Sequence, residues 1–395
     1  MAFFRNDAIN RVNLHYGVHA FAAGAGATFY FAYLLRAGVP VPATLATFAA
    51  SLAGRFAMRP LALPLARRWG LKPIVAAGAL TQVGPYLILP TVHGVGPSLV
   101  LLAAVSAASD TWYWPAYHAY FAAIGDAEHR GHQIGAREAL AAAAGVVAPL
   151  LGGWALVAAG SWITFGGVAV IQAASALPLI GAPAVPVAVR APGAWRAARS
   201  GLALFASDGW FGACYYFVWL VMLFLSLGRN FAAYGGAMAL AALVGAIVGL
   251  FFGRHIDRGH GRRAAVIAYL VGGAVVAMRA ASLGSPWLAV AANACGAFVG
   301  ALVVPAMMTA VYNLAKASPC PFRFHVATEG AWDAGGFAGA LTAAALSAVG
   351  APLSFAVLLA LPAAAASTWL LWRYYGVQPD AGGIELEPLL AGEPP

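Results

Sequence analysis

Long apolar runs alternate with short polar or Gly/Pro-rich pieces along most of the chain. Each run reaches the roughly 20 residues that a helix needs to cross the hydrocarbon core of a bilayer. Irregular backbone cannot face lipid, so we interpret each run as a transmembrane helix. The twelve predicted helices cover residues 12–35, 43–66, 72–93, 97–123, 133–158, 161–183, 203–228, 231–253, 264–284, 286–315, 324–350 and 352–375.

Basic residues distinguish the two ends of these helices. If the chain starts in the cytoplasm and crosses twelve times, only Arg36, Arg229 and Arg279 of the 22 Lys and Arg lie on the outward side. This asymmetry follows the positive-inside rule. We therefore expect a multi-pass protein of a bacterial inner (plasma) membrane, with both termini in the cytoplasm.

Composition excludes several other classes of protein. Of the 395 residues, 62% are hydrophobic and 9% charged, whereas soluble domains carry about 25% charged residues. The net charge of +9 sits in short loops, so we expect no nucleic-acid partner. The sequence shows no metal-ligand spacing, nucleotide-binding loop or nucleophile triad, and we expect no metal, no cofactor and no enzymatic activity.

The chain divides into two predicted halves. The Pro-, Ala- and Arg-rich stretch 184–202 reads as a cytoplasmic linker. It would join an N-terminal six-helix half, 1–183, to a C-terminal six-helix half, 203–375. The acidic, Gly/Pro-containing tail 376–395 is expected to be disordered. The predicted fold is an all-α integral membrane protein with two pseudo-symmetric six-helix bundles.

Two acids occupy corresponding positions in the halves. Glu138 and Glu329 lie near the cytoplasmic starts of the fifth and eleventh helices, and each is followed seven residues later by a glycine, Gly145 or Gly336. Internal repeats of this kind are common in transporters.

The loop between the eighth and ninth helices carries a recognisable motif. Gly253, Asp257, Arg258, Gly261, Arg262 and Arg263 resemble the loop signature of the major facilitator superfamily, with one residue added before the second glycine. The resemblance implies alternating access between the halves. It also implies a cytoplasmic gate formed by Gly253, Asp257, Arg258 and Arg262 with Arg137 at the start of the fifth helix. The alternative is a plain positive-inside loop.

The fifth helix contains Gly145, Ala148, Pro149, Gly152 and Gly153. This series resembles the glycine-proline signature of the same superfamily, with Ala148 in place of a glycine, and that signature is often linked to antiporters. Small residues that merely let helices approach closely are the alternative explanation.

The fourth helix offers a candidate substrate face. Asp110, Trp114, Tyr117 and His118 follow helical spacing. A carboxylate beside aromatic rings suits an aromatic or cationic ligand. An interfacial aromatic belt is the alternative, but Asp110 lies too deep in the helix for a belt.

The eleventh helix offers candidate proton carriers. His325, Glu329 and Asp333 recur every four residues, and Asp333 lies nearest the middle of the membrane. A carboxyl group withdrawn from water retains a proton more readily, which suits proton coupling. We expect Asp333, Glu329 and Glu138 to carry protons. The alternative is a structural cluster of ion pairs with Arg137 or the loop arginines.

Further candidates lie on helices that line the cavity in the superfamily. They are Asp208 and Tyr215 on the seventh helix and His19 on the first. On the second helix, Arg55 could neutralise an acid or bind a substrate carboxylate, whereas Arg59 is expected to snorkel toward the cytoplasm.

These features predict a secondary active transporter of small organic molecules, coupled to protons or another ion, acting as a monomer in the lipid bilayer. A drug/proton antiporter is the alternative within transport. A non-transporting membrane sensor or assembly partner is the alternative from another class.

Overall fold

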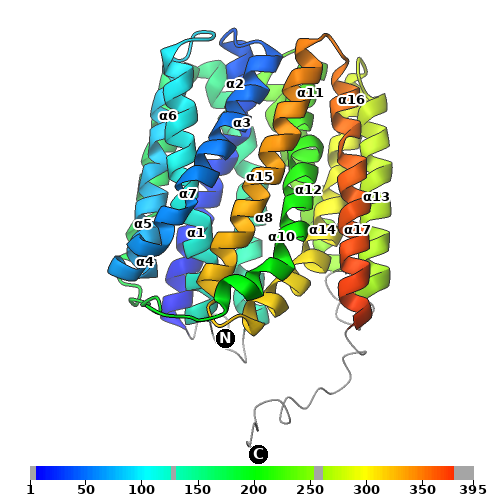
Figure 1. The fold of residues 1–395 in the computed structure, drawn as a ribbon. Helices are drawn as coiled ribbons and strands as arrows, with labels where there is room; N and C mark the ends of the chain where they lie inside the picture. The colour runs from blue at the N-terminus through cyan, green and yellow to red at the C-terminus, as the bar shows by residue number, and fades with distance from the viewer. Residues whose placement is uncertain (1–5, 126–129, 253–260, 378–395) are drawn as a thin grey trace, which may run out of the picture.

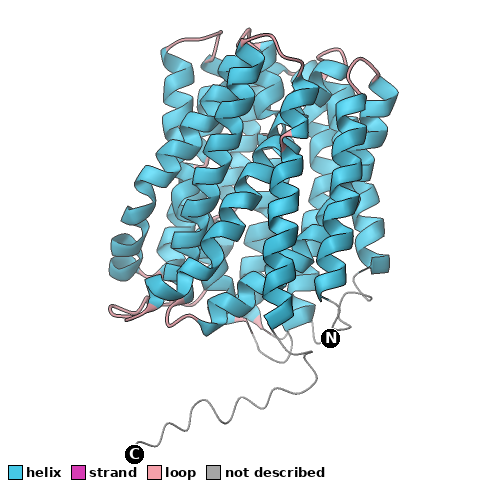
Figure 2. Ribbon diagram, turned by 45° about the vertical axis from the view of Figure 1, so that its right-hand side comes forward, coloured by secondary structure: helices cyan, strands magenta, loops and turns pink. Residues whose placement is uncertain are grey.

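The structure is a computed structural model that describes residues 6–125, 130–252 and 261–377. These residues form helices, with no strand among them. Figure 1 shows the helices standing side by side, and α1 begins at the same end of the bundle at which α17 ends. Loops gather at the two ends (Figure 2).

The first part of the chain forms nine α-helices with short 3-10 turns between some of them. They are α1 (Asp7–Ala25), α2 (Tyr30–Arg36), α3 (Val41–Met58), α4 (Ala62–Trp69), α5 (Leu71–Thr81), α6 (Val83–Ile88), α7 (Pro97–Ile124), α8 (Arg130–Ala158) and α9 (Gly160–Ala174), with turns η2 (Ala27–Phe29), η3 (Arg59–Leu61), η4 (Leu89–Thr91) and η5 (Leu177–Leu179).

The second part of the chain is similarly helical. It comprises α10 (Ala194–Gly212), α11 (Val218–Ser226), α12 (Phe231–Phe252), α13 (Gly261–Ala281), α14 (Pro286–Ala317), α15 (Pro321–Ala348), α16 (Leu353–Leu358) and α17 (Ala360–Val377). A π-helical turn, η6 (Ala213–Phe217), joins α10 to α11.

Nine segments within the described residues are long and apolar enough to cross a membrane. They are Asp7–Arg36, Leu71–Thr91, Gln133–Ala158, Gly160–Leu179, Ala194–Ser226, Phe231–Val248, Gly261–Ala281, Pro286–Ala317 and Leu353–Gly376. The other three long helical stretches are α3 with α4, α7 and α15. Charged and aromatic side chains lower their mean hydropathy, and these same three stretches carry most of the candidate site.

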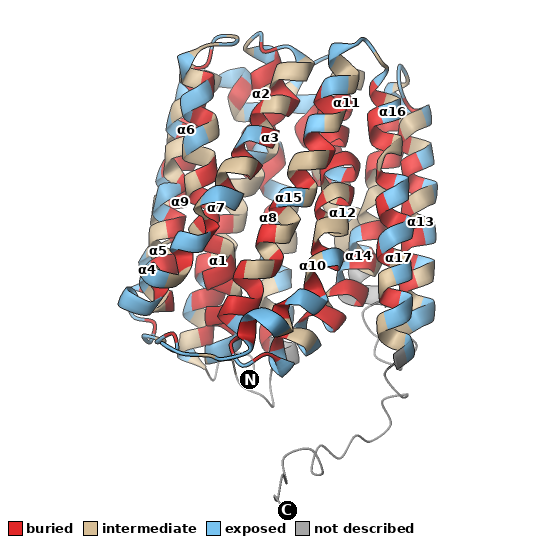
Figure 3. Cartoon of the chain, in the orientation of Figure 1, coloured by how far each residue is buried: buried red, intermediate tan, exposed pale blue. Residues whose placement is uncertain are grey.

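Exposed apolar side chains cover the outer faces, as a lipid-facing surface requires. Leu270 is 68% exposed and Trp287 86%. Exposed residues run along α13 and α17 at the edge of the bundle (Figure 3).

The predicted linker is shorter in the structure, because α10 begins at Ala194 and not near 203. Arg196 and Arg199 are exposed on the first turns of α10 and do not interrupt the helix. The extended part is bound to the bundle. Leu71 donates its backbone N–H to the Val185 carbonyl (2.8 Å), and Arg323 of α15 donates to the Val189 carbonyl (3.0 Å).

Two seams join the first part of the chain, α1–α9, to the second part, α10–α17. At one seam α3 packs against α15, and at the other α8 packs against α12. Gly145 of α8 faces Ala242 of α12, and Gly336 of α15 faces Leu52 of α3. Both glycines singled out in the sequence therefore lie against the opposite part of the chain.

Candidate functional site

A cluster of charged side chains lies at the seam between α3 and α15. Arg55 of α3 contacts Asp333 of α15 through Nη2 and Oδ1 at 2.9 Å. Its Nη1 lies 3.7 Å from Oδ2 of Asp110 on α7. The Asp333 side chain is fully enclosed and that of Arg55 is 10% exposed. One arginine thus joins the acid of α15 to the acid of α7.

Arg59 completes the cluster from η3, at the end of α3. Its Nε donates to Oδ2 of Asp333 at 3.1 Å, and its Nη2 contacts the same oxygen. Nη2 also lies 4.0 Å from Oε2 of Glu329. The Arg59 side chain is 3% exposed, so the expectation that it snorkels was wrong. The guanidinium of Arg59 pairs with the Asp333 carboxylate of the neighbouring helix α15, so it does not extend to the membrane surface.

The acids of α15 pair with the arginines of α3 and η3. The alternative explanation for Glu329 and Asp333 was a structural cluster of ion pairs with Arg137 or the loop arginines. Arg137 instead donates from Nε to Oε1 of its neighbour Glu138 (3.0 Å) and lies 5.2 Å from the centre of the Tyr16 ring. Glu138 is 56% exposed and is the most accessible of the proposed proton carriers.

A chain of amides holds Asp110 from the opposite side. Gln82 Nε2 donates to Oδ1 of Asp110 (3.0 Å), and Gln172 Nε2 donates to Oε1 of Gln82 (3.1 Å). Gln172 Nε2 also donates to the Ala79 carbonyl (3.0 Å), which fixes the orientation of this amide. Its Oε1 therefore accepts from Nδ1 of His19, 3.1 Å away. His19, Gln172 and Gln82 thus donate in succession toward Asp110.

Neither glutamine was among the residues that the sequence pattern indicated. The available signal was an amide inside an otherwise apolar helix, because such a group must find a partner once it is buried.

His15 is held by helix packing in the same region. Its Nδ1 lies 2.7 Å from the Ser175 carbonyl, which can only accept, and its Nε2 lies 2.9 Å from the Tyr113 hydroxyl. The Nδ1–H tautomer therefore donates to Ser175 and accepts from Tyr113. Both ring nitrogens are used within the helix bundle.

The aromatic face of α7 divides between two environments. Trp114 stacks on His118 with ring centroids 5.8 Å apart, and His118 lies 5.8 Å from His325 of α15. Tyr117 is fully buried and stacks on Tyr16 of α1 at 5.3 Å. His118 therefore reaches toward α15, whereas Tyr117 packs against α1 and Trp114 lies 5.9 Å from the His19 ring of α1.

The two candidates on the seventh predicted helix are not brought together. Asp208 accepts from Nε1 of Trp332 on α15 (2.9 Å). Tyr215 lies beneath the guanidinium of Arg279, 4.0 Å from the ring centre, and donates to the Gly296 carbonyl (3.3 Å). Tyr215 lies within the π-helical turn η6, which shifts its helical register relative to Asp208, and the spacing argument could not include that shift.

Arg279, predicted on the outward side, is buried in the last turn of α13, 3% exposed. It also lies 4.7 Å from the ring centre of Trp219. The aromatic rings and the Tyr215 carbonyl, which accepts from Nη1 at 2.6 Å, surround the cation.

Three residues of the predicted gate, Gly253, Asp257 and Arg258, lie outside the described residues. Arg262 is described and lies against the end of α17. Its Nε donates to the Trp372 carbonyl (3.0 Å), and its guanidinium lies 4.7 Å from the Trp372 ring centre.

A cavity of about 280 Å³ adjoins the charged cluster. It is lined by Phe56, Arg59, Pro60, Leu63, Trp195, Val326, Ala327 and Gly330. Its walls are mostly apolar, and Arg59 is the charged group that reaches it.

Comparisons with known proteins agree with this architecture. The family model of the Major Facilitator Superfamily matches residues 16–319. No curated protein matches the chain.

Solved structures of transporters share the fold. A POT family transporter in complex with 5-aminolevulinic acid has a TM-score of 0.70 at 10% identity, covering 94% of this chain and 96% of that one. The POT family transporter PepTSo has a TM-score of 0.65 at 12% identity, covering 95% and 99%. The nucleoside transporter NupG has a TM-score of 0.61 at 14% identity, covering 93% and 99%. Family and fold point to a transporter and not to an enzyme.

Proposed function

Because the chain belongs to the major facilitator superfamily, we propose that it is a proton-coupled secondary active transporter of small organic molecules. It crosses a bacterial inner membrane twelve times with both ends in the cytoplasm. Nine crossings are the apolar segments described above, and α3 with α4, α7 and α15 supply three more. The two six-helix halves then meet at the α3/α15 and α8/α12 seams, and transport alternates access between them as a monomer.

The charged cluster at the α3/α15 seam carries this proposal. It contains two arginines, Arg55 and Arg59, and three carboxyl groups, those of Asp110, Glu329 and Asp333. With every group ionised, two positive and three negative charges sum to −1. One proton therefore neutralises the cluster, and charge buried in a membrane is costly.

Protonation would act on the contact between the halves. Asp333 is the acceptor shared by both arginines, so a proton on its carboxyl group weakens both ion pairs across the seam. We assign Asp333 as the principal proton carrier. Glu329 and Glu138, at corresponding positions of α15 and α8, are secondary carriers.

The substrate is proposed to bind between α7 and α15. Asp110 and Arg55 supply charge there, while Trp114 and His118 supply aromatic faces for stacking. Asp208 and His19 lie at the borders of this region. Tyr117 and Tyr215 are enclosed by neighbouring helices, and their contact with the substrate stays a prediction.

The test has two stages. A thermal-shift screen of metabolites and drugs on purified protein first identifies a ligand. Substrate-driven proton flux is then measured in proteoliposomes for the native protein, for Asp333→Asn and for the exposed acid variant Asp7→Asn. We expect Asp333→Asn to lose coupled flux and Asp7→Asn to retain it. Undiminished flux in that variant would remove Asp333 from the role.

A drug/proton antiporter is the second candidate, and the close glycine packing of α8 favours it. A methyl group on Gly152 would overlap the Ala25 carbonyl of α1, and one on Gly153 would lie 2.6 Å from the Phe231 carbonyl. The two candidates differ in the direction of the pH gradient that drives net movement. An inward proton gradient expels the ligand by antiport and accumulates it by symport.

A further inference from the structure

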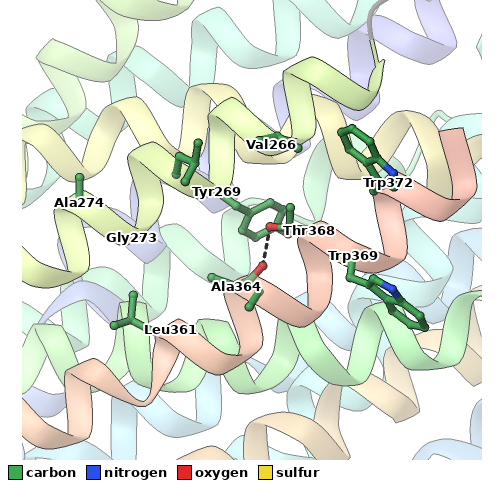
Figure 4. A pocket seen from close by; sticks show the side chains of 11 residues that line it. Val266, Tyr269, Gly273, Ala274, Leu361, Ala364, Thr368, Trp369 and Trp372 are labelled. Carbon is green, nitrogen blue, oxygen red and sulfur yellow. Dashed lines mark hydrogen bonds between the residues drawn. The ribbon is translucent and has the colours of Figure 1, made fainter. Parts of the chain in front are cut away.

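A second cavity is a groove between α13 and α17, far from the charged cluster. Its volume is about 620 Å³, and its lining includes Leu270, Gly273, Ala274, Leu361, Ala365 and Trp369. Figure 4 shows Ala274 and Leu361 toward one end of the groove and Trp369 and Trp372 at the other.

Small residues on both helices keep the groove open. A methyl group on Gly273 would meet only Leu361, at 3.6 Å, and Ala365 is exposed. Large apolar side chains form its edges, with Leu270 68% and Trp369 55% exposed. Such a surface excludes water and suits a flexible hydrocarbon chain.

The length of the groove matches one leaflet. Leu361 and Trp372 are eleven residues apart on α17, which is roughly 17 Å along a helix. Half of a hydrocarbon core of about 30 Å is about 15 Å. The groove therefore runs from one membrane surface to about the middle of the bilayer.

Positive charge is concentrated at the end of the groove where α17 ends. Arg262, Arg263 and Arg373 are exposed there, and neither α13 nor α17 contains an acidic residue. Arg262 lies over the Trp372 ring, and Arg373 lies 4.8 Å from the Trp369 ring centre. Two of the three arginines are thus held beside the aromatic edge of the groove.

We propose that this groove binds an anionic phospholipid, with an acyl chain along α13 and α17 and the phosphate at Arg262, Arg263 and Arg373. Basic residues at a membrane surface attract anionic lipids, and indole rings favour the interface. The lipid would lie in the leaflet at the end of the bundle where α1 begins and α17 ends. In the proposed topology this is the cytoplasmic leaflet. The proposal requires neither a substrate nor proton coupling.

Native mass spectrometry of the full chain tests the apolar part. The probes are phosphatidylglycerol and phosphatidylcholine with identical acyl chains. Ala365→Phe fills the groove, whereas Ala366→Phe adds the same ring at a neighbouring exposed position outside the lining. We expect Ala365→Phe to lose bound lipid and Ala366→Phe to retain it. Equal retention in the two variants would overturn the site.

The charged part is tested with Arg373→Gln and Arg263→Gln against the control Arg199→Gln, an exposed arginine at the start of α10. Each groove arginine removed should lower phosphatidylglycerol binding about fivefold and leave phosphatidylcholine unchanged, since a basic residue near the surface contributes about that factor. Equal binding of the two lipids by the native chain would refute the headgroup assignment. A dimer that disappears with Ala365→Phe would assign the groove to a second copy instead.

Discussion

Arg55 and Arg59 share one acceptor, the carboxyl group of Asp333, and both guanidinium groups are nearly enclosed. An isolated charge in such surroundings would be strongly destabilising, and pairing offsets that cost. The chain therefore depends on all members of the cluster being present together. This dependence can be measured as a coupling energy between single side chains.

We expect Arg59→Met and Asp333→Leu each to destabilise the protein by about 3–5 kcal/mol, because each leaves a buried charge without its partner. The double variant should lose clearly less than the sum of the two. Reversible unfolding in mixed micelles measures all four corners of the cycle.

Arg67→Met at the exposed end of α4 is the control, and its effect should stay within about 0.5 kcal/mol. Strictly additive losses for Arg59 and Asp333 would contradict direct coupling.

At the level of helices, close backbone contacts decide which helices become neighbours. A methyl group on Gly335 of α15 would overlap the Ala206 carbonyl of α10, and one on Gly235 of α12 would overlap the Pro149 carbonyl of α8. In a bilayer, such close approach supplies the van der Waals contacts that replace the hydrophobic effect between helices. Glycine therefore has a packing role at these positions.

Gly335→Ala should destabilise the protein by about 1–3 kcal/mol, because α10 and α15 must move apart to admit the methyl group. Gly300→Ala on α14 meets nothing within 4 Å and should be neutral or stabilise by up to about 1 kcal/mol, as alanine favours the helix. Thermal melting in detergent compares the two. Equal shifts would show that the α10/α15 contact does not limit stability.

Across the whole molecule, contacts between α1–α9 and α10–α17 occur toward both ends. At one end Phe48 and Phe217 approach with ring centroids 4.2 Å apart, and Phe31 lies 5.9 Å from Phe217. Toward the other end His118 meets His325, and Arg323 of α15 holds the chain that links the halves. Alternating access requires these two sets of contacts to separate at different times.

Spin labels test this movement. We expect the distance between labels at Val95 and Val349 to change in the opposite direction to the distance between labels at Arg68 and Arg199 when a substrate is added or the pH is lowered. Pulsed electron paramagnetic resonance measures both distances.

Val95 paired with Trp162 is the control, since both belong to the first part of the chain, and the distance between them should stay constant. Parallel changes at the two ends would indicate swelling of the bundle and not alternation.

Much of the site was predictable residue by residue. Asp110, Asp333, Glu329 and Arg55 stood out because a charge inside an apolar run is rare. Their partners were not predictable, and Arg59 was assigned wrongly, because snorkelling assumes that no acid is within reach. The glutamines of the amide chain carry no charge and were overlooked.

The sequence by itself determined that this chain is helical, apolar on its outer surface and polar at a few buried positions. Those properties depend on each segment's own hydropathy, and a transmembrane helix satisfies its backbone hydrogen bonds internally. For the same reason, the hydropathy of a helix does not specify which other helices pack beside it. Only the tertiary structure brought Arg59 to Asp333, 274 residues away in the chain, and separated Tyr215 from Asp208 through the π-helical turn. Contacts between neighbouring helices, which no single segment encodes, set both arrangements.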